Sequence, residues 1–446
     1  MIAYFPELYP DELLYSGVAR LCNRLGFSHH RFVLKDLFRA TNVSALIDLP
    51  RNIDQLLSEL PTQNSMACDE LIDNHTLLPF YSPFVTSKRL QEVRMLMKRG
   101  CQSPVQMTLG LTRSQVQSPD SLRFCPSCQE EDVEKFREPY WHRGPQIRGF
   151  EICPKHQVFI EDSSVERLIR EKTSVFRCAS VGQKRKLARG ISLTNPEHHT
   201  LVRLAVNIEW IVNQKTLFVG ARPLQKIYLN LLKERGFTTC NGRLYLERLL
   251  AAFYQKFPDR LLRRLHCQLR VRQETPWLIR LIRTPKGLQA PLRHLLFIDF
   301  LGYTAEEFFT CVAKTNVPYR PFGEGPWQCF NPVCSKRFSR PIKRVTIRHC
   351  FQHKEGAGIF SCPNCGFAYR KLISEALTNR RWTVDLGPMW RQALKDLWNN
   401  PYRTIREMKE ILEADALTVK RHAIRLGCNY PRHSHSKSGT QISTSK

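Results

Sequence analysis

The stretch Cys125-Pro-Ser-Cys128 is followed, after twenty-four residues, by Cys153-Pro-Lys-His156. Each pair suits a tight turn that aims both ligand atoms at one point, and two such pairs complete a tetrahedral site. Three thiolates and one imidazole favour zinc, and four protein ligands leave no position for water. The sequence therefore predicts a zinc finger over residues 121–176, with a structural ion. The expected ligands are Cys125, Cys128, Cys153 and His156.

A second group of cysteines lies in the last third of the chain. Cys329-x4-Cys334 is followed, after twenty-seven residues, by Cys362-Pro-Asn-Cys365. Outer Cys pairs around a strand-rich insert are typical of a zinc ribbon, which we expect over residues 321–375. The insert also holds Cys350-Phe-Gln-His353, so three half-sites compete for one ion. We expect Cys329, Cys334, Cys362 and Cys365 to bind it, with Cys350 and His353 as the alternative.

Three short helices are predicted over residues 383–430. Trp390 and Leu394 mark the first, and Thr404-Ile-Arg-Glu407 is a capping box that opens the second. The side chains expected to face inward from the second helix are Ile405, Met408 and Ile411. A break over residues 413–416 precedes a third, basic helix. This order is typical of a helix-turn-helix, whose last helix lies in the major groove of DNA, although a three-helix cap with a solvated face has the same pattern.

The third helix of this group has two distinct sides. At about 100° per residue, Val419, Ala423 and Leu426 face the core. The basic side chains point the other way and are our candidates for contacts with DNA. These candidates are Thr418, Lys420, Arg421 and Arg425. Residues 431–446, rich in Ser, His and Lys, are expected to be a disordered tail.

Helical patterns also fill residues 177–320, where arginine is dense. The sequence predicts a helix from Pro291 that ends at Gly302, and a capping box formed by Thr304 and Glu307. Guanidinium groups suit phosphate oxygens, so we expect residues 177–320 to form a DNA-binding domain. The candidate residues are Arg260, Arg263, Arg264, Arg270, Lys184, Arg185 and Lys186.

The N-terminal 120 residues are predicted to be helical. We expect Asp11 to cap a helix that Gly26 stops, followed by a second amphipathic stretch. Helix, turn and helix can form a DNA-binding helix-turn-helix or a plain helical hairpin. The whole chain is thus expected to be multi-domain and mainly α, with small zinc-bound β elements and two zinc modules.

The composition points to a polyanionic partner. The 446 residues contain 68 Lys and Arg against 40 Asp and Glu, a net charge of +28, and nucleic acid is the usual partner for such a surplus. The start lacks a signal-peptide pattern, and no apolar run approaches the ~20 residues that span a bilayer. We therefore expect a cytoplasmic protein, in which the 16 cysteines serve as thiols and metal ligands.

We expect no enzymatic activity. The carboxylates are scattered, with no spaced set that would hold the paired divalent metals of a nuclease. No Gly-x4-Gly-Lys-Ser/Thr phosphate loop is present in the sequence. The two predicted zinc sites are closed and offer no Lewis acid.

Two motifs resemble those of the TnsD/TniQ family of bacterial transposon target selectors. One is the opening Phe5-Pro-Glu-Leu-Tyr9-Pro-Asp-Glu-Leu13, and the other joins Phe124-Cys-Pro-Ser-Cys128 to Tyr140-Trp-His-Arg143 and Cys153-Pro-Lys-His156. The resemblance covers the first half of the chain. It implies a factor at the bacterial nucleoid that marks an insertion site and recruits the AAA+ regulator TnsC, with the transposase acting afterwards.

The resemblance leaves two functions open. Longer TnsD members read a double-stranded DNA attachment site themselves and carry further DNA-binding modules towards the C-terminus. Short TniQ members attach to a CRISPR effector complex, which reads the target through its guide RNA. The second cysteine group, the arginine-rich middle and the last three helices favour TnsD. The adaptor for a CRISPR effector stays as the alternative.

Overall fold

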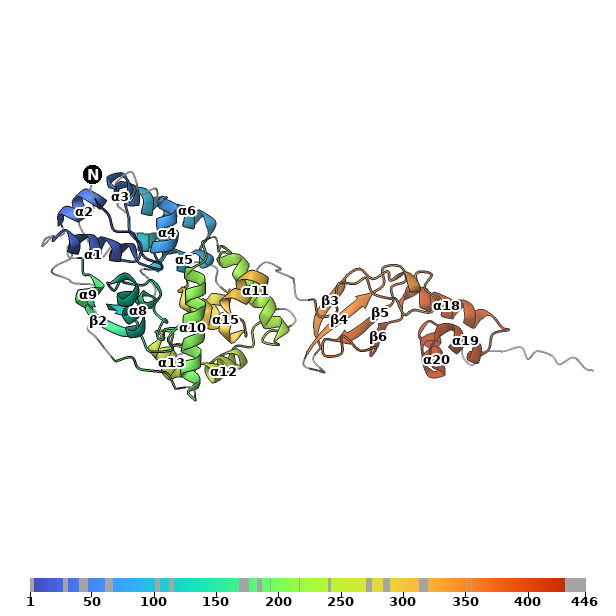
Figure 1. The fold of residues 1–446 in the computed structure, drawn as a ribbon. Coiled ribbons are helices and arrows are strands. Elements are labelled where there is room, and N and C mark those ends of the chain that lie inside the picture. Colours follow the sequence, from blue (N-terminus) through green and yellow to red (C-terminus); the bar gives the residue numbers. More distant parts are fainter. Residues whose placement is uncertain are drawn as a thin grey trace, which may run out of the picture. The chain divides into compact units, whose positions relative to one another are not determined.

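The computed structural model describes most of the chain. The described residues are 4–26, 31–39, 47–60, 67–100, 105–111, 116–167, 176–182, 187–192, 194–215, 217–239, 242–269, 275–283, 289–312, 320–350, 352–353 and 355–429. The chain forms two compact units (Figure 1). The first comprises Met1–Leu231 with Leu250–Val317, and the second comprises Leu232–Leu249 with Pro318–Lys446. Lys184, Arg185, Lys186, Arg270 and the tail over residues 431–446 lie outside the described residues.

Short helices make up the N-terminal part of the first unit. They are α1 (Leu14–Arg24), α2 (Arg31–Phe38), α3 (Ile53–Glu59), α4 (Cys68–His75), α5 (Leu78–Tyr81), the 3-10 turn η2 (Ser82–Phe84), α6 (Ser87–Arg99) and α7 (Val105–Leu109). The expectation that Asp11 caps α1 is wrong. Asp11 has a left-handed φ of 59°, and the residue before α1 is Leu13, which makes no side-chain cap. Gly26 does end the helix, in a left-handed turn at φ 64°.

The first cysteine pair follows directly after a strand of a two-stranded sheet. Strand β1 (Ser121–Phe124) runs antiparallel to β2 (Glu161–Glu166), with Arg123 opposite Asp162 and Phe124 opposite Glu161. Helix α8 (Pro126–Phe136) starts directly after β1, with Pro126 at its first position. Between α8 and β2 the chain makes the 3-10 turn η4 (Gly144–Gln146), and α9 (Ala179–Gly182) follows β2.

Further helices lie between residue 196 and residue 312. They are α10 (Pro196–Val212), α11 (Ala221–Glu234), α12 (Leu246–Lys256), α13 (Asp259–Arg264), α14 (Trp277–Arg283), α15 (Pro291–Phe300), α16 (Ala305–Glu307) and the π-turn η5 (Phe308–Val312). Two predictions are confirmed here. Helix α15 begins at Pro291 and ends just before Gly302, and Thr304 with Glu307 forms the expected capping box.

The second unit contains the ribbon sheet. The order of its antiparallel strands is β3 (Val345–Cys350), β4 (Glu355–Ser361), β5 (Ala368–Leu372) and β6 (Trp382–Asp385), preceded by the 3-10 turn η6 (Arg337–Ser339). Phe360 of β4 pairs with Val345 on one side and with Tyr369 on the other. The rings of Phe360 and Tyr369 stack at 4.7 Å beside the four cysteines, which gives this small sheet its core. Strand β6 extends the sheet beyond residue 375.

Three helices close the second unit: α18 (Gly387–Asn399), α19 (Ile405–Leu412) and α20 (Ala416–Arg425). The capping box of Thr404 and Glu407 is confirmed at the start of α19. The buried side chains are Trp390, Leu394, Trp398, Met408, Leu412, Val419 and Ala423. Ile411 was expected to face inward, but it is exposed and Leu412 is buried in its place. Met408 and Leu412 are four residues apart and share the buried side of α19, while Ile411 lies about 100° away from Leu412 around the helix.

The ribbon and the three helices are joined within the second unit. The two terminal nitrogens of the Arg337 guanidinium donate to the carboxylate of Glu413, each at 2.8 Å. Leu386 packs against the hydrophobic clusters of both modules, and Val333 of the ribbon packs against that of the helices. In the described part of the chain, no helix has the length and apolar character that crossing a membrane requires.

Candidate metal centres and nucleic-acid interface

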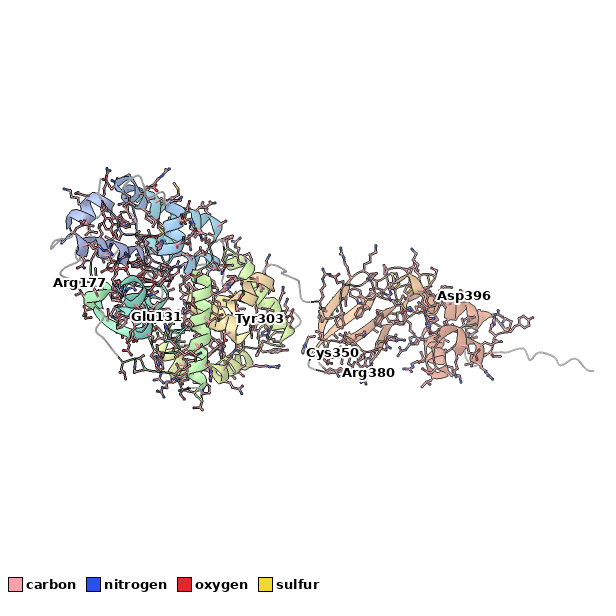
Figure 2. All side chains as sticks on the ribbon, viewed as in Figure 1. Glu131, Arg177, Tyr303, Cys350, Arg380 and Asp396 are labelled. Atoms are coloured by element: carbon pink, nitrogen blue, oxygen red, sulfur yellow. The ribbon has the colours of Figure 1, made fainter. Side chains whose placement is uncertain are left out.

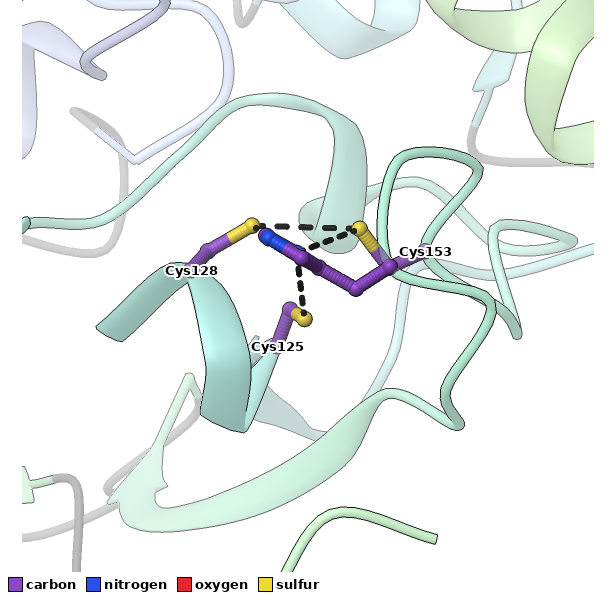
Figure 3. Close-up of side chains that lie close together, drawn as sticks. Cys125, Cys128 and Cys153 are labelled. Carbon is purple, nitrogen blue, oxygen red and sulfur yellow. Dashed lines mark hydrogen bonds between the residues drawn. The ribbon is translucent and has the colours of Figure 1, made fainter. Parts of the chain in front are cut away.

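The first cysteine group has the geometry of a zinc site. Cys125 directly precedes α8 and Cys128 lies in its first turn, while Cys153 and His156 come from the loop before β2. Figure 3 shows the three cysteines converging. The Cys128 and Cys153 sulfurs are 3.8 Å apart, and His156 Nδ1 lies 3.6, 3.3 and 3.5 Å from the sulfurs of Cys125, Cys128 and Cys153. Ligands about 2.3 Å from one metal at tetrahedral angles stand about 3.8 Å apart, so these four residues fit zinc.

Glu131 of α8, labelled in Figure 2, is hydrogen-bonded to the ring nitrogen of His156 that faces away from the three sulfurs. Because Nδ1 faces the sulfurs, Nε2 carries the proton and donates to Glu131 Oε1 at 2.9 Å. The Lys155 ammonium pairs with the other oxygen of the same carboxylate. Hydrogen bonds from Lys155 and then from His156 lower the pKa of Glu131. No pattern in the sequence indicates Glu131 as a partner of the site, since only the fold brings it to His156.

The crowded thiols favour a bound cation. Hydrogen bonds to Cys125 and Cys153, together with burial, raise the pKa of the Cys128 thiol well above its ordinary value. Adjacent thiolates repel one another, and a divalent cation removes that cost because it binds the deprotonated sulfurs. The protein supplies all four ligands, which leaves no open coordination position, so the site is suited to a structural role.

A buried polar network next to this centre was not foreseen from the sequence. The Arg143 guanidinium, with a side chain only 4% exposed, donates to Asp11 Oδ1 at 2.7 Å and to Asn213 Oδ1 at 2.9 Å. It also donates to the carbonyl oxygens of Asp73 at 2.9 Å and of Val212 at 3.3 Å. One side chain therefore ties the N-terminal helices, the loop of the first centre and the end of α10 together.

His142 lies beside Arg143 and takes part in the same network. Its Nε2 is 2.9 Å from Asp132 Oδ2, and its Nδ1 is 3.7 Å from Asp11 Oδ2. Burial alone would lower the pKa of His142, but the Asp11 and Asp132 carboxylates raise it to about 10. The ring is therefore held as a cation between two acids, and it bridges α8 to the residues before α1.

The second cysteine group also converges on one point. The sulfurs of Cys329, Cys334, Cys362 and Cys365 lie within 4.8 Å of one another, and all four residues are buried. The Cys329 and Cys365 sulfurs are 3.5 Å apart, close to the separation of two zinc ligands. Cys350, labelled in Figure 2, lies instead at the end of β3 against Ala357 and Leu372. The His353 ring packs near Trp382 at 5.8 Å, so the structure does not bring this half-site into the group.

The arginine-rich candidates of the first unit differ in their surroundings. Arg263 is exposed and pairs with Asp259 one turn earlier at 2.8 Å. Arg264 pairs with Glu151 at 3.4 Å and stacks over the Phe159 ring at 5.4 Å, which are long-range contacts that the sequence could not reveal. Arg260 is exposed and lines a pocket of about 400 Å³ with Arg264 and His198. All three side chains are exposed, and Arg264 differs in its long-range pairing with Glu151.

Helix α20 has the two-sided character that the sequence predicted. Val419 and Ala423 are fully buried, whereas Arg421 and Arg425 are exposed and Lys420 is half-buried. The Asp415 side chain caps the helix: it accepts from the Thr418 amide at 2.8 Å and from its hydroxyl at 2.7 Å. Thr418 is thus engaged at the helix start, and this cap was not foreseen.

Comparisons with known proteins agree with the resemblance noted in the sequence. The TnsD family model, described as Tn7-like transposition protein D, matches residues 204–446, which is more than half of the chain. The chain belongs to the TnsD/TniQ family. The TniQ family model matches residues 3–160. The transposition protein TnsD of transposon Tn7 from Escherichia coli is 31% identical over 156 residues, which are 35% of this chain and 31% of that protein.

The two family matches divide the sites between them. The TniQ match contains the first metal centre and the network of His142 and Arg143. The TnsD match contains the ribbon, its four cysteines and α20. The aligned part spans about a third of the length of the Escherichia coli protein. This TnsD/TniQ member is mainly helical, with small antiparallel sheets at both candidate metal centres.

Proposed function

We propose that this protein selects the target of a Tn7-like transposon. It recognises a double-stranded DNA attachment site and recruits the AAA+ regulator TnsC, and the transposase acts after TnsC. The observation that carries the proposal is α20, a basic helix exposed on a three-helix module inside the TnsD match. The turn before α20 and its position as third helix fit a recognition helix in the major groove. The protein acts at the bacterial nucleoid and has no catalytic step of its own.

The proposed DNA contacts fall into two classes. Arg421 and Arg425 are exposed on α20: Arg421 would donate to guanine edges, and Arg425, Lys420 and Thr418 lie beside it. Arg260 and Arg263 of α13 are exposed and suit phosphate oxygens. The net charge of +28 supports a phosphate-rich partner. The wider set of proposed phosphate contacts includes Arg264, Arg270, Lys184, Arg185 and Lys186.

Two structural zinc ions are part of the proposal. The first, held by Cys125, Cys128, Cys153 and His156, would fix the loop that positions Arg143. The second, held by the four ribbon cysteines, would fix the base of the sheet that meets α18. Closed zinc sites supply folding free energy directly, so both ions would hold binding surfaces rather than react.

A second candidate function rests on the TniQ match over residues 3–160. In it the chain is an adaptor between a CRISPR effector complex and TnsC, and the guide RNA reads the target. The two functions differ in where sequence specificity lies. The reader selects one DNA sequence alone, whereas the adaptor needs the effector complex for specificity.

Selection of genomic fragments by the purified full chain, followed by footprinting, separates the two functions. The binding buffer must have physiological salt, because a protein with 68 basic residues retains any DNA at low ionic strength. We expect one long, asymmetric protected site, since the modules along the chain differ from one another. Uniform, salt-labile retention of all fragments would refute the reader and favour the adaptor.

A further inference from the structure

The exposed side of α20 carries two large apolar side chains besides its basic residues. Leu417 is 68% exposed and Ile424 is 54% exposed. Single exposed apolar residues are common on protein surfaces. These two, however, lie one above the other on a helix whose other side is completely buried against α18 and α19.

The spacing of these residues places them at the centre of the exposed side. At about 100° per residue, Leu417, Arg421 and Ile424 fall within roughly 60° of one another, opposite Val419 and Ala423. Lys420 lies on one flank of this stripe and Arg425 on the other. The helix, Ala416–Arg425, contains no acidic residue. Its solvent side is therefore an apolar stripe, interrupted by Arg421, with cations along both edges.

This pattern matches one surface of DNA. The floor of the major groove offers a single apolar group, the C5-methyl of thymine, and its walls are lined with phosphates. Cations on both edges suit the two walls, and apolar side chains between them suit the floor. We propose that Leu417 and Ile424 contact thymine methyl groups and so determine which bases α20 selects. This inference deepens the proposed function and rests on it.

The start of α20 is fixed in a way that suits such a contact. Asp415 caps the helix through two hydrogen bonds from Thr418, and Glu413 takes the left-handed turn before it. Leu417 therefore stands in the first turn, the part of a recognition helix that meets base edges. Seven residues separate Leu417 from Ile424, about 10 Å along the helix and about three base-pair steps. The two thymines are expected two to four base pairs apart.

Deoxyuridine tests this proposal, because it differs from thymidine only by the absent methyl group. Each thymine of the protected site is replaced singly, and the affinity of the full chain is measured at physiological salt. Burial of one methyl contributes enough that its removal lowers affinity about fourfold. We expect such a loss at two positions and none at the other thymines.

Variants assign each methyl to a side chain. Leu417→Ala should bind the thymine site about fourfold more weakly and should no longer respond to deoxyuridine at one of the two positions. Ile424→Ala should do the same at the other position. Leu377→Ala is the matched control, since Leu377 is fully exposed in the same unit, and it should keep both deoxyuridine effects. Circular dichroism of each variant verifies that the helices remain folded.

The outcomes separate this inference from the proposed function. A protected site whose affinity changes at no deoxyuridine position overturns the inference and leaves the DNA reader standing. A chain that protects no defined site overturns the reader and the inference together. Unchanged DNA binding by Leu417→Ala, with weaker capture of purified TnsC, would assign the stripe to a protein partner and also overturn the inference.

Discussion

Replacing Glu131 by Gln should weaken zinc binding at the first centre without altering its ligands. Glu131 Oε1 accepts from His156 Nε2 at 2.9 Å, which keeps Nδ1 deprotonated and aimed at the three sulfurs. Loss of such a partner carboxylate lowers metal affinity by about 10- to 100-fold. The Glu131 side chain is 45% exposed, so solvent screens part of this interaction and we expect the lower end, about tenfold.

The assay is competition with a chromophoric zinc chelator. The chain offers an internal reference, because the four ribbon cysteines form a separate candidate site in the other unit, and an ion held there should be released at an unchanged chelator concentration. Glu134→Gln is the matched control, since Glu134 is exposed on the same helix α8. Release of both ions by Glu131→Gln at the wild-type chelator concentration would refute the role assigned to Glu131.

Four further changes test the network, the charge and the fold. Arg143→Met should lower the free energy of unfolding in urea by about 3–5 kcal/mol, because it leaves buried acceptors without a donor. The same change at Arg263, whose side chain is 64% exposed, should cost less than about 1 kcal/mol. Equal costs for the two variants would contradict the role of the network. His142 has a folded pKa of about 10, above the ordinary 6.5, so its stabilising charge is fully present below pH 6.5 and lost as pH rises through 10. The advantage of wild type over His142→Asn should therefore shrink from about pH 7 to 10, by at most about 1.4 kcal/mol per pH unit, and parallel pH curves would count against it. Arg421→Ala should weaken binding to the selected DNA site by about 1–3 kcal/mol and relax selectivity locally; unchanged affinity in quantitative footprinting removes it from the recognition surface. Cys128→Ser should lose one zinc by metal analysis and unfold the first zinc module, and a variant with wild-type metal content and melting temperature would disprove that claim.

Local signals in the sequence predicted local structure well. The capping boxes at Thr304 and Thr404 lie where the residue spacing indicated, because the two reciprocal hydrogen bonds of a capping box join residues only three apart. The spacing of each Cys pair likewise predicted the local turn that brings its two ligand atoms together. The choice of Cys329 and Cys334 over Cys350 and His353 needed the strand register, which the spacing leaves open.

Long-range contacts account for what the sequence could not supply. Asp11 looked like a helix cap, but it instead accepts a hydrogen bond from Arg143, 132 residues away. Arg264, a candidate for phosphate contact, pairs with Glu151 across 113 residues, a contact that the sequence could not indicate. Composition shows that charges are present, and only the fold shows which of them are already compensated within the protein.

The link between Arg337 and Glu413, with Leu386 shared by the two clusters, has a consequence for the length of DNA that the second unit occupies. If the ribbon also contacts DNA, these contacts would keep the footprints of the two modules at a constant separation. An extra base pair inserted between those footprints would move one of them by about 3.4 Å and turn it by about 35° around the duplex axis. If both modules contact the proposed attachment site, we expect the second unit to reject a correct sequence at the wrong spacing.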